Sequence, residues 1–438
     1  MANITMIGTG YVGLVSGACL ADFGHDVTCV DIDKNRIAAL RRGEIPIYEP
    51  GLKDVVVKNV EGERLQFTTD LAPAVRGAEV VFIAVGTPPQ EDGGTDLSFV
   101  FAAARDIAKH LEGYTVVVQK STAPVGTARE IGHVIAAEKP KNAECDIVAN
   151  PEFLREGSAV GDFMRPDRVI VGAETERARQ LMKQVYRPLY LLETPIVWTS
   201  LESAEMIKYA SNSYLAAKIS FINEMAHICE LLGANVDDVA SGMGLDGRIG
   251  KKFLHAGIGY GGSCLPKDVA SLIHVARERG YDAPVISAAH AVNRDLPGRA
   301  IEKLMRTTGE LNAKTIALLG LAFKPNTDDL REAPALRVVH ELLKAGARVK
   351  VFDPVAMDNF RKQVKAPVEY AKNAYDAANG ADAVVLVTEW NEFRELDFDR
   401  LKAVMRGKVF IDCRNVYSPA RVEGEGFVYD SFGRGKPR

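Results

Sequence analysis

The sequence lacks any grouping of its few cysteines. Six cysteines are spread over 438 residues, and no two of them form a C-x-x-C pair. A zinc site or a disulfide framework is therefore not expected in a chain long enough to bury its own core, and we predict no metal site. The opening residues, MANITMIGTG, have no basic and apolar leader pattern, so we expect a cytoplasmic protein with reduced thiols.

Strong charge and long apolar runs are missing as well. The formal net charge is −4, which gives no reason to expect nucleic acid or an anionic membrane as a partner. We find no run of about 18 apolar residues, the length that a membrane-spanning helix needs. The chain length predicts about two to four globular domains.

The two ends of the chain share a pattern of short apolar runs that alternate with helical stretches. The first third contains NITMIG, HDVTCVDID, AEVVFIAVG and TVVVQKST, and the last third contains KTIALLGLAF, ARVKVFDP, ADAVVLVTEW and GKVFIDCRN. This alternation is typical of parallel sheets with crossover helices. We therefore predict an α/β protein with two Rossmann-like, doubly wound parallel sheets.

The stretch between the two ends has helical composition and no strand-like run. No proline or glycine occurs from residue 200 until Gly233, which predicts one long helix ended by that glycine. Thr199 and Glu202 fit a capping box at its start. Apolar residues cover much of the circumference of this helix, which predicts a homodimer in which it packs against its own copy. The predicted domains are residues 1–199, 200–300 and 301–438.

A glycine-rich turn follows the first predicted strand. In GTGYVG, Gly8, Gly10 and Gly13 form a G-x-G-x-x-G motif that opens a predicted helix. Such glycines allow a tight turn, close approach of a pyrophosphate and helix–strand packing, although packing alone is an alternative. Asp31 ends the next strand and can bind both ribose hydroxyls, which favours NAD over NADP. Lys34 nearby keeps NADP open.

Two later strands end on the same edge of the sheet, in VGTPP (85–89) and KST (120–122). Ligands bind at this edge in such folds, so Thr87 and Thr122 are candidates for contact with cofactor or substrate. Either threonine could instead be a helix cap. The NAD-binding residues predicted in this part of the chain are Gly8, Gly10, Tyr11, Val12, Gly13, Asp31, Lys34, Gly86, Thr87 and Thr122.

The stretch GYGGSCLPKD (259–268) places a cysteine where a helix begins. Pro266 suits the first turn of that helix, so Cys264 lies at its N-terminus, where the helix dipole and Lys267 would stabilise a thiolate. The glycines before it let the backbone approach a ligand closely. A buried, inert thiol is the alternative, and we expect that role for the remaining cysteines, Cys19, Cys29, Cys145, Cys229 and Cys413.

Polar residues elsewhere in the chain suit a reaction at a Cys264 thiolate. Asp268 lies one helical turn after Cys264 and could be a base or only a favourable first-turn charge. Lys208 and Asn212 lie one turn apart on the long helix, an arrangement that suits an oxyanion or alkoxide. A surface pair of Lys208 with Glu205 is the alternative.

The loop ANPEFLREGSA follows the strand-like run CDIVA. It offers two carboxylates, Glu152 and Glu156. Solvated surface charge is the default interpretation of both.

The set of motifs, in this order, resembles that of the nucleotide-sugar dehydrogenases, the UDP-glucose/GDP-mannose dehydrogenase family, over nearly the whole chain. The resemblance rests on GTGYVGL, PIYEPGL, VGTPP, STAPVGT, NPEFLREGSA, EMIKYASNSYLAAKISFINE, GIGYGGSCLPKD and GLAFKPNTDDLREAP. It implies an NAD-binding domain, a central helical dimerisation domain and a C-terminal domain that binds the nucleotide sugar. Within the family, the sequence is most similar to the group that acts on UDP-glucose.

The resemblance implies a four-electron oxidation of UDP-glucose to UDP-glucuronate, with two NAD used in turn. A Cys264 thiolate would trap the intermediate aldehyde as a thiohemiacetal, which is oxidised to a thioester and then hydrolysed. The other catalytic residues implied are Lys208 for the oxyanion, Asn212, Asp268 and Thr122 for a water molecule, and Glu152 for thioester hydrolysis. The group that takes the first proton stays open.

Further contacts follow from the same resemblance. Glu156 and Arg331 would join the cofactor contacts, with Arg331 near the pyrophosphate. Lys324 and Arg414 would meet the nucleotide end of the substrate, and Arg248 would reach the site of the partner subunit. The full set of implied substrate contacts is Glu152, Phe153, Leu154, Glu156, Lys208, Asn212, Arg248, Phe253, Tyr260, Gly261, Lys324 and Arg414.

Two alternatives stay open. The same chemistry could act on GDP-mannose, UDP-N-acetylmannosamine or UDP-N-acetylglucosamine. The protein could also be an NAD-binding redox sensor that uses Cys264 as its switch, although a sensor would need only the thiol and none of its polar companions.

Overall fold

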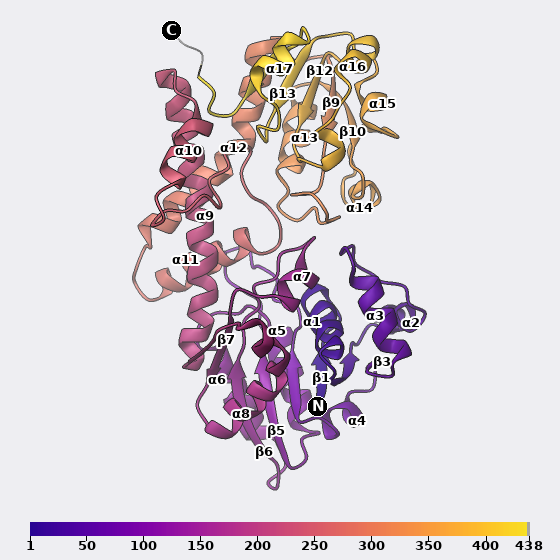
Figure 1. The fold of residues 1–438 in the computed structure, drawn as a ribbon, viewed down its shortest axis with the longest axis vertical. Coiled ribbons are helices and arrows are strands. Elements are labelled where there is room, and N and C mark those ends of the chain that lie inside the picture. The colour runs from indigo at the N-terminus through magenta and orange to yellow at the C-terminus, as the bar shows by residue number, and fades with distance from the viewer. Residues whose placement is uncertain (436–438) are drawn as a thin grey trace. The chain divides into compact units, whose positions relative to one another are not determined.

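A computed structural model describes residues 1–435 of the chain. They form two compact units, Met1–Ser211 and the part from Asn212 onward (Figure 1). The first unit contains β1 (Asn3–Ile7), α1 (Tyr11–Asp22), β2 (Asp26–Val30), α2 (Lys34–Arg41), α3 (Leu52–Glu61), β3 (Leu65–Thr68), α4 (Leu71–Arg76), β4 (Val80–Ile83), α5 (Ser98–Ala108), β5 (Tyr114–Gln119), α6 (Thr127–Glu138), β6 (Glu144–Ala149), α7 (Ala159–Met164), β7 (Val169–Ala173), α8 (Glu176–Val185), η1 (Arg187–Leu192), β8 (Ile196–Thr199) and the start of α9 (Leu201–Leu232).

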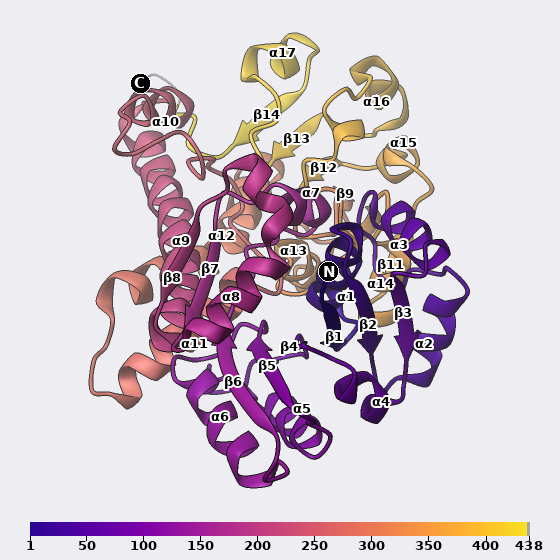
Figure 2. The same cartoon turned by 60° about the horizontal axis from the view of Figure 1, so that its bottom comes forward.

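The first unit is built on an eight-stranded sheet with the order β3-β2-β1-β4-β5-β6-β7-β8. Its strands pair in parallel, except that β7 runs antiparallel to β6. Apolar residues of α1, α3, α7 and α8 pack on one side of the sheet, and those of α4, α5 and α6 on the other (Figure 2). Burial of both faces explains the continuous apolar strands, and the predicted doubly wound sheet is confirmed.

The loops with the predicted site residues leave the carboxyl ends of parallel strands. β1 runs into the glycine turn at residues 8–10, and β4 is followed by Gly86 and Thr87. β5 and β6 lead into the loops that hold Thr122 and Glu152. The strand order reverses between β1 and β4, and ligands bind at such a switch point in open α/β sheets.

The predicted long helix is α9, with 32 residues. Thr199 is the last residue of β8, so Ser200, and not Thr199, accepts the capping hydrogen bond, from the N–H of Ser203 at 3.1 Å. Gly233, with a φ of 77°, follows the last helical residue, as predicted. Among residues 1–435, no helix combines the length and apolar character that crossing a bilayer requires.

The second unit holds the rest of α9, further helices and a parallel sheet. Its further elements are α10 (Val236–Gly244), α11 (Leu265–Glu278), α12 (Pro284–Thr308), β9 (Thr315–Leu319), α13 (Pro334–Lys344), β10 (Arg348–Phe352), α14 (Met357–Gln363), β11 (Val368–Tyr370), α15 (Ala374–Ala378), β12 (Ala383–Leu386), η2 (Asn391–Phe393), α16 (Phe398–Val404), β13 (Val409–Asp412), α17 (Pro419–Gly424) and β14 (Val428–Ser431).

The sheet of the second unit has the order β11-β10-β9-β12-β13-β14, with parallel pairs throughout the described strands. It repeats the order of the first six strands of the other sheet, which confirms the prediction of two Rossmann-like sheets. Residues 201–308 form helices and loops without a strand, so the helical middle is also confirmed. α12 continues past residue 300, where the C-terminal domain was expected to begin.

Candidate active site

The glycine turn after β1 has the shape expected of a pyrophosphate cradle. Gly8 has a φ of 99°, and a Cβ there would lie 2.6 Å from the carbonyl oxygen of Ala84. A Cβ on Gly13 would lie 2.0 Å from the carbonyl oxygen of Gly8. A Cβ on Gly10 would meet nothing within 4 Å, so packing alone does not explain this glycine. The open space over Gly10, at the N-terminus of α1, fits an NAD pyrophosphate.

Asp31 follows β2 and lies beside this turn. Its carboxylate accepts hydrogen bonds from the N–H and hydroxyl of Thr9, at 2.8 and 2.7 Å, and from the N–H of Asp33, at 3.0 Å. Partial burial acts to raise the pKa of Asp31, but these hydrogen bonds outweigh it and the pKa is lowered. A charged Asp31 would repel a 2′-phosphate, which favours NAD. Lys34 is exposed, and Arg36 lies 3.5 Å from Asp31.

The predicted threonines do not cap helices. The N-caps of α5 and α6 are Leu97 and Gly126. Instead, the hydroxyl of Thr87 donates to the backbone carbonyl of Thr122 at 2.9 Å. Gly86 next to it is exposed, and a Cβ there would meet nothing within 4 Å. The loops after β4 and β5 are therefore joined at the carboxyl edge of the sheet.

Glu152 and Lys208 form a buried ion pair. The ammonium of Lys208 lies 3.0 Å from a carboxylate oxygen of Glu152, and the two side chains are 4% and 5% exposed. The second oxygen of Glu152 accepts from the N–H of Leu154 at 2.5 Å. The Lys208 ammonium lies 5.2 Å from the ring centre of Phe153. Solvated surface charge was the default interpretation of Glu152 and Glu156. It is wrong for both, because both side chains are buried.

Lys120, which sequence reasoning missed, is buried in the same unit. Its ammonium donates to the side-chain oxygen and the backbone carbonyl of Asn150, at 3.1 and 3.3 Å. Burial lowers the pKa of Lys120 to about 8, and the charges of Glu152 and Lys208 act on it in opposite directions. The available signal was a lysine at the end of the apolar run VVVQK.

Glu205 does not form the surface pair with Lys208 that was the alternative. It is buried, and its carboxylate accepts from the N–H groups of Gly126 and Ala128, at 2.6 and 2.8 Å, at the start of α6. Burial raises the pKa of Glu205 to about 7 against the lowering effect of these two amides. The carboxylate therefore belongs to the packing of α6 on α9.

Cys264 is the N-cap of α11, as predicted, and is half-buried. The N–H of Asp268 donates to the carbonyl of Cys264 at 2.9 Å and closes the first helical turn. The side chain of Asp268 is 1% exposed and lies 2.8 Å from the ammonium of Lys267. It also accepts from the side-chain amide of Asn212 at 2.6 Å. Asp268 is therefore part of a buried polar network and not a solvated first-turn charge.

The glycines before Cys264 are required by the protein's own packing. A Cβ on Gly257 would lie 2.5 Å from the carbonyl oxygen of Cys413. A Cβ on Gly261 would lie 2.3 Å from that of Glu332. Ligand approach was the expected reason for these glycines, whereas the structure shows backbone of the same unit occupying that space.

Asn293 of α12, also missed by sequence reasoning, holds the middle of the same loop. Its side chain accepts from the N–H of Tyr260 and donates to the carbonyl of Tyr260, at 2.9 and 3.0 Å. A Cβ on Gly259 would lie 2.5 Å from the Asn293 oxygen, and one on Gly262 would lie 2.7 Å from the ring of Phe323. A single asparagine in a helix without a motif gave no signal for this role.

Arg414 contacts the glycine loop directly. Its guanidinium donates to the backbone carbonyls of Gly259 and Phe323, at 2.9 and 3.0 Å, and lies 3.1 Å from the carboxylate of Glu389. The ammonium of Lys324 lies 5.5 Å from the ring centre of Phe323. The two cations predicted for the nucleotide end thus share Phe323 as a neighbour.

Two further predicted arginines point to solvent. The side chain of Arg331 is 59% exposed and lies 2.8 Å from Asp329. The side chain of Arg248 is 89% exposed and lies 2.5 Å from Asp246. Phe253 has a φ of 66°, a left-handed conformation that is strained for phenylalanine and often marks functional loops.

The cysteines expected to be inert are buried or half-buried. Burial is the largest cause that raises the thiol pKa in all five, to about 12 in Cys19, Cys29 and Cys145. Such thiols stay protonated and unreactive. The structure described for residues 1–435 contains no disulfide and no group of three or more metal-ligating side chains.

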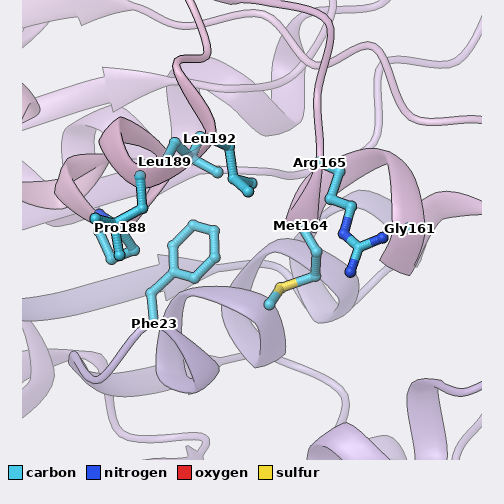
Figure 3. Close-up of a pocket in the computed structure, with 8 residues that line it drawn as sticks. Phe23, Gly161, Met164, Arg165, Pro188, Leu189 and Leu192 are labelled. Atoms are coloured by element: carbon cyan, nitrogen blue, oxygen red, sulfur yellow. The ribbon is translucent and has the colours of Figure 1, made fainter.

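A pocket of about 590 Å³ lies on the first unit (Figure 3). Its walls are mostly apolar and come from α1, α7, η1 and their flanking residues. The residues that line it are Phe23, Gly161, Met164, Arg165, Pro188, Leu189, Leu191 and Leu192. None of them belongs to the predicted site.

Comparison with known proteins places this geometry in a family. Models of the UDP-glucose/GDP-mannose dehydrogenase family match residues 2–190 (NAD binding domain), 202–295 (central domain) and 317–419 (UDP binding domain). A UDP-glucose 6-dehydrogenase of Rhizobium meliloti (strain 1021) is 54% identical over 436 residues, 99% of each chain.

Two solved structures cover the same length. A UDP-glucose dehydrogenase from the hyperthermophilic archaeon Pyrobaculum islandicum has a TM-score of 0.92 at 37% identity, over 100% of this chain and 98% of its own. A UDP-D-ManNAc dehydrogenase from Pyrococcus horikoshii has a TM-score of 0.86 at 28% identity, over 99% of this chain and 100% of its own. The chain therefore belongs to the UDP-glucose/GDP-mannose dehydrogenase family.

Proposed function

We propose that this protein is an NAD-dependent oxidoreductase that converts UDP-glucose into UDP-glucuronate in a four-electron oxidation. The observation that carries the proposal is Cys264 at the N-terminus of α11, with Asp268 buried one turn later and bonded to Asn212. The UDP-glucose 6-dehydrogenase that is 54% identical over 99% of the chain supports UDP-glucose as the sugar.

The first unit supplies the cofactor site. The amides after Gly10 face the space that fits a pyrophosphate, and Asp31 is the acceptor for the ribose hydroxyls. NAD, when bound, takes up a hydride from the substrate carbon, and two molecules of NAD account for four electrons. Glu156 and Arg331 complete the proposed cofactor contacts.

The cysteine holds the substrate between the two oxidations. Once the 6-hydroxymethyl group is an aldehyde, the Cys264 thiolate forms a C–S bond to it and the aldehyde oxygen takes a proton. Loss of two more electrons turns the thiohemiacetal into a thioester. Water then cleaves the C–S bond, leaves the carboxylate and returns the thiol. The position of Cys264 at a helix N-terminus favours the thiolate that starts this sequence.

The polar residues of α9 stabilise and orient the reacting groups. The buried ammonium of Lys208 faces the developing oxyanion, where low polarity strengthens the interaction. Glu152, held by Lys208, serves in hydrolysis of the thioester. Asn212 and Asp268 orient the water, with Thr122 in the same network. Lys208 and Asn212 lie one turn apart on one helix. We therefore assign the pair of Lys208 with Glu152 and the pair of Asn212 with Asp268 to one reaction.

The remaining substrate contacts are proposals that rest on the family. Lys324 and Arg414 take the nucleotide end, and Arg248 serves the site of a second subunit. The others are Glu152, Phe153, Leu154, Glu156, Phe253, Tyr260 and Gly261. A second candidate substrate, UDP-N-acetylmannosamine, has the support of the Pyrococcus horikoshii structure, at 28% identity against 54% for the UDP-glucose relative.

The exposed face of α9 supports a homodimer. Tyr214, Phe221 and Ile228 are 63%, 46% and 39% exposed, and they recur every seven residues, the spacing of a helix–helix seam. Leu231 extends the stripe at 56% exposure. A row of exposed apolar residues of this kind is stable when it packs against another copy of the same helix.

The proposed domains are residues 1–199 for NAD, 200–300 for dimerisation and 301–438 for the UDP-sugar. The three consecutive family matches support this division. The cytoplasmic location stays a prediction.

The test is the ratio of NADH formed to sugar consumed. The purified protein is incubated with NAD and, separately, with UDP-glucose, UDP-N-acetylmannosamine, UDP-N-acetylglucosamine or GDP-mannose. We expect two NADH for each UDP-glucose consumed. A ratio of one, or no consumption of UDP-glucose, contradicts the proposal.

A further inference from the structure

Glu49 is a buried carboxylate that the chemistry above does not use. It lies in the loop between α2 and α3 and is 7% exposed. A carboxylate is rarely buried unless its oxygens are paired. Those of Glu49 accept hydrogen bonds from the N–H of Gly157 at 2.6 Å, from the N–H of Ala159 at 2.7 Å, and from the phenol of Tyr11.

The donors to Glu49 belong to the start of α1 and to the end of the loop that holds Glu152. Tyr11 is the first residue of α1, directly after the glycine turn, and its phenol oxygen also accepts from the N–H of Gly157 at 3.1 Å. Burial and the nearby Glu49 charge raise the pKa of Tyr11, so the phenol remains a donor. Gly157 and Ala159 close the loop that begins at Glu152, which we call the substrate loop (residues 152–159).

We propose that Glu49 is a positioning residue that fixes the substrate loop to the first turn of the NAD-binding helix. The role as a link between cofactor and sugar rests on the proposed function. Glu49 reaches the reaction only through other residues, because its carboxylate contacts main-chain amides of the substrate loop and one phenol. Glu152 and Phe153 lie in the substrate loop, so their placement depends on this anchor. A displacement of about 1 Å at reacting groups can cost about a hundredfold in rate.

The charge of Glu49 is essential to the anchor. A carboxylate offers acceptors on both oxygens, which matches three donors. Glutamine has the same length, but its amide nitrogen is a donor and would face one of the N–H groups of Gly157 or Ala159. Loss of a hydrogen bond to a charged group corresponds to a change of about tenfold to a hundredfold in an equilibrium.

The first test is steady-state kinetics of Glu49→Gln. We expect the KM for UDP-glucose to rise by about tenfold or more, while the Kd for NAD without sugar changes by less than about threefold. Glu44→Gln is the matched control, since Glu44 lies in the same loop, is exposed and pairs with Arg42; it should keep the wild-type KM. An unchanged KM in Glu49→Gln overturns the proposal.

Tyr11→Phe supplies a milder variant that keeps the amide contacts of Glu49. We expect a smaller rise in the KM for UDP-glucose than in Glu49→Gln, and no further rise when both changes are combined. Full additivity of the two changes would show that the phenol and the carboxylate act separately, which contradicts the link.

Hydrogen exchange separates this inference from the proposed function. In Glu49→Gln, the amides at residues 157–159 should exchange at least about tenfold faster than in the wild type, whatever sugar the enzyme accepts. If the wild type makes no NADH from UDP-glucose, the proposed function fails and this measurement still decides on the anchor. If these amides keep wild-type protection in Glu49→Gln, or if protection is lost over the whole first unit, the proposal that Glu49 anchors the substrate loop is overturned.

Discussion

The side-chain amide of Asn212 donates to the carboxylate of Asp268 at 2.6 Å. Asp268 is fully buried, and its N–H closes the first turn of α11 on the carbonyl of Cys264. One carboxylate therefore joins α9 to the helix that begins beside the cysteine. The position suits a group that orients water next to the sulfur.

Asp268→Asn tests this relationship. The amide keeps the size of the side chain, but it removes the charge that holds Asn212 and the ammonium of Lys267. We expect kcat to fall by at least about a hundredfold, as for loss of an acid–base group, with NAD binding unchanged. Stopped-flow and steady-state NADH assays check this. Glu278→Gln, an exposed change on the same helix, should keep the wild-type rate.

The buried pair of Lys208 and Glu152 predicts an unusual pattern of stability. Lys208→Met leaves a carboxylate buried without its cation and should cost about 3–5 kcal/mol in the free energy of unfolding. Adding Glu152→Gln removes the orphan charge, so the double variant should be more stable than Lys208→Met alone. Urea unfolding measures both. As a control, Arg129→Met breaks exposed pairs with Glu174 and Glu202 and should leave the urea midpoint of unfolding nearly unchanged. Equal stability of the single and double variants would contradict the prediction.

Glu205 predicts a dependence of stability on pH. Burial raises its folded-state pKa from 4.5 to about 7, so the folded state binds the proton more tightly than the unfolded state. The stability that comes from the protonated form is full below about pH 4.5 and is lost as the pH rises through about 7. Glu205→Gln cannot titrate. The stability of the wild type relative to this variant should therefore fall by about 2–3 kcal/mol between pH 5 and pH 8. A flat difference in urea unfolding across this range would refute the assignment.

The stripe on α9 predicts the assembly. Phe221→Asp places a charge in the centre of the proposed seam and should convert the dimer into a monomer in sedimentation at micromolar concentration. Val285→Asp is the control, because Val285 is 74% exposed on α12 and lies outside the stripe. A wild-type protein that sediments as a monomer would already exclude the dimer.

Local sequence signals predicted the parts of the fold that depend on neighbouring residues. The glycine turn and Asp31 are recognisable because their spacing within one βαβ unit is fixed by the geometry of the fold. The position of Cys264 follows from Pro266 two residues after it, and Gly233 ends α9 where the chain needs a positive φ.

Contacts between distant residues left little trace in the sequence. Glu152 was assigned to solvent because its partner, Lys208, lies 56 positions away in the chain. Glu205 was paired with its helical neighbour, whereas its amide partners belong to α6, 77 and 79 positions away. The catalytic roles of Glu152 and Lys208 were suggested by family resemblance, since spacing alone allowed a surface pair of Lys208 with Glu205.

The central claim is that Cys264 is the nucleophile, and Cys264→Ser tests it most directly. With UDP-glucose and NAD in excess, steady-state NADH production should nearly stop, while NAD binding in the absence of sugar keeps its wild-type Kd. Cys145→Ser, a change at another half-buried cysteine, should keep the wild-type rate of NADH production. Turnover of Cys264→Ser at the wild-type rate would contradict the account.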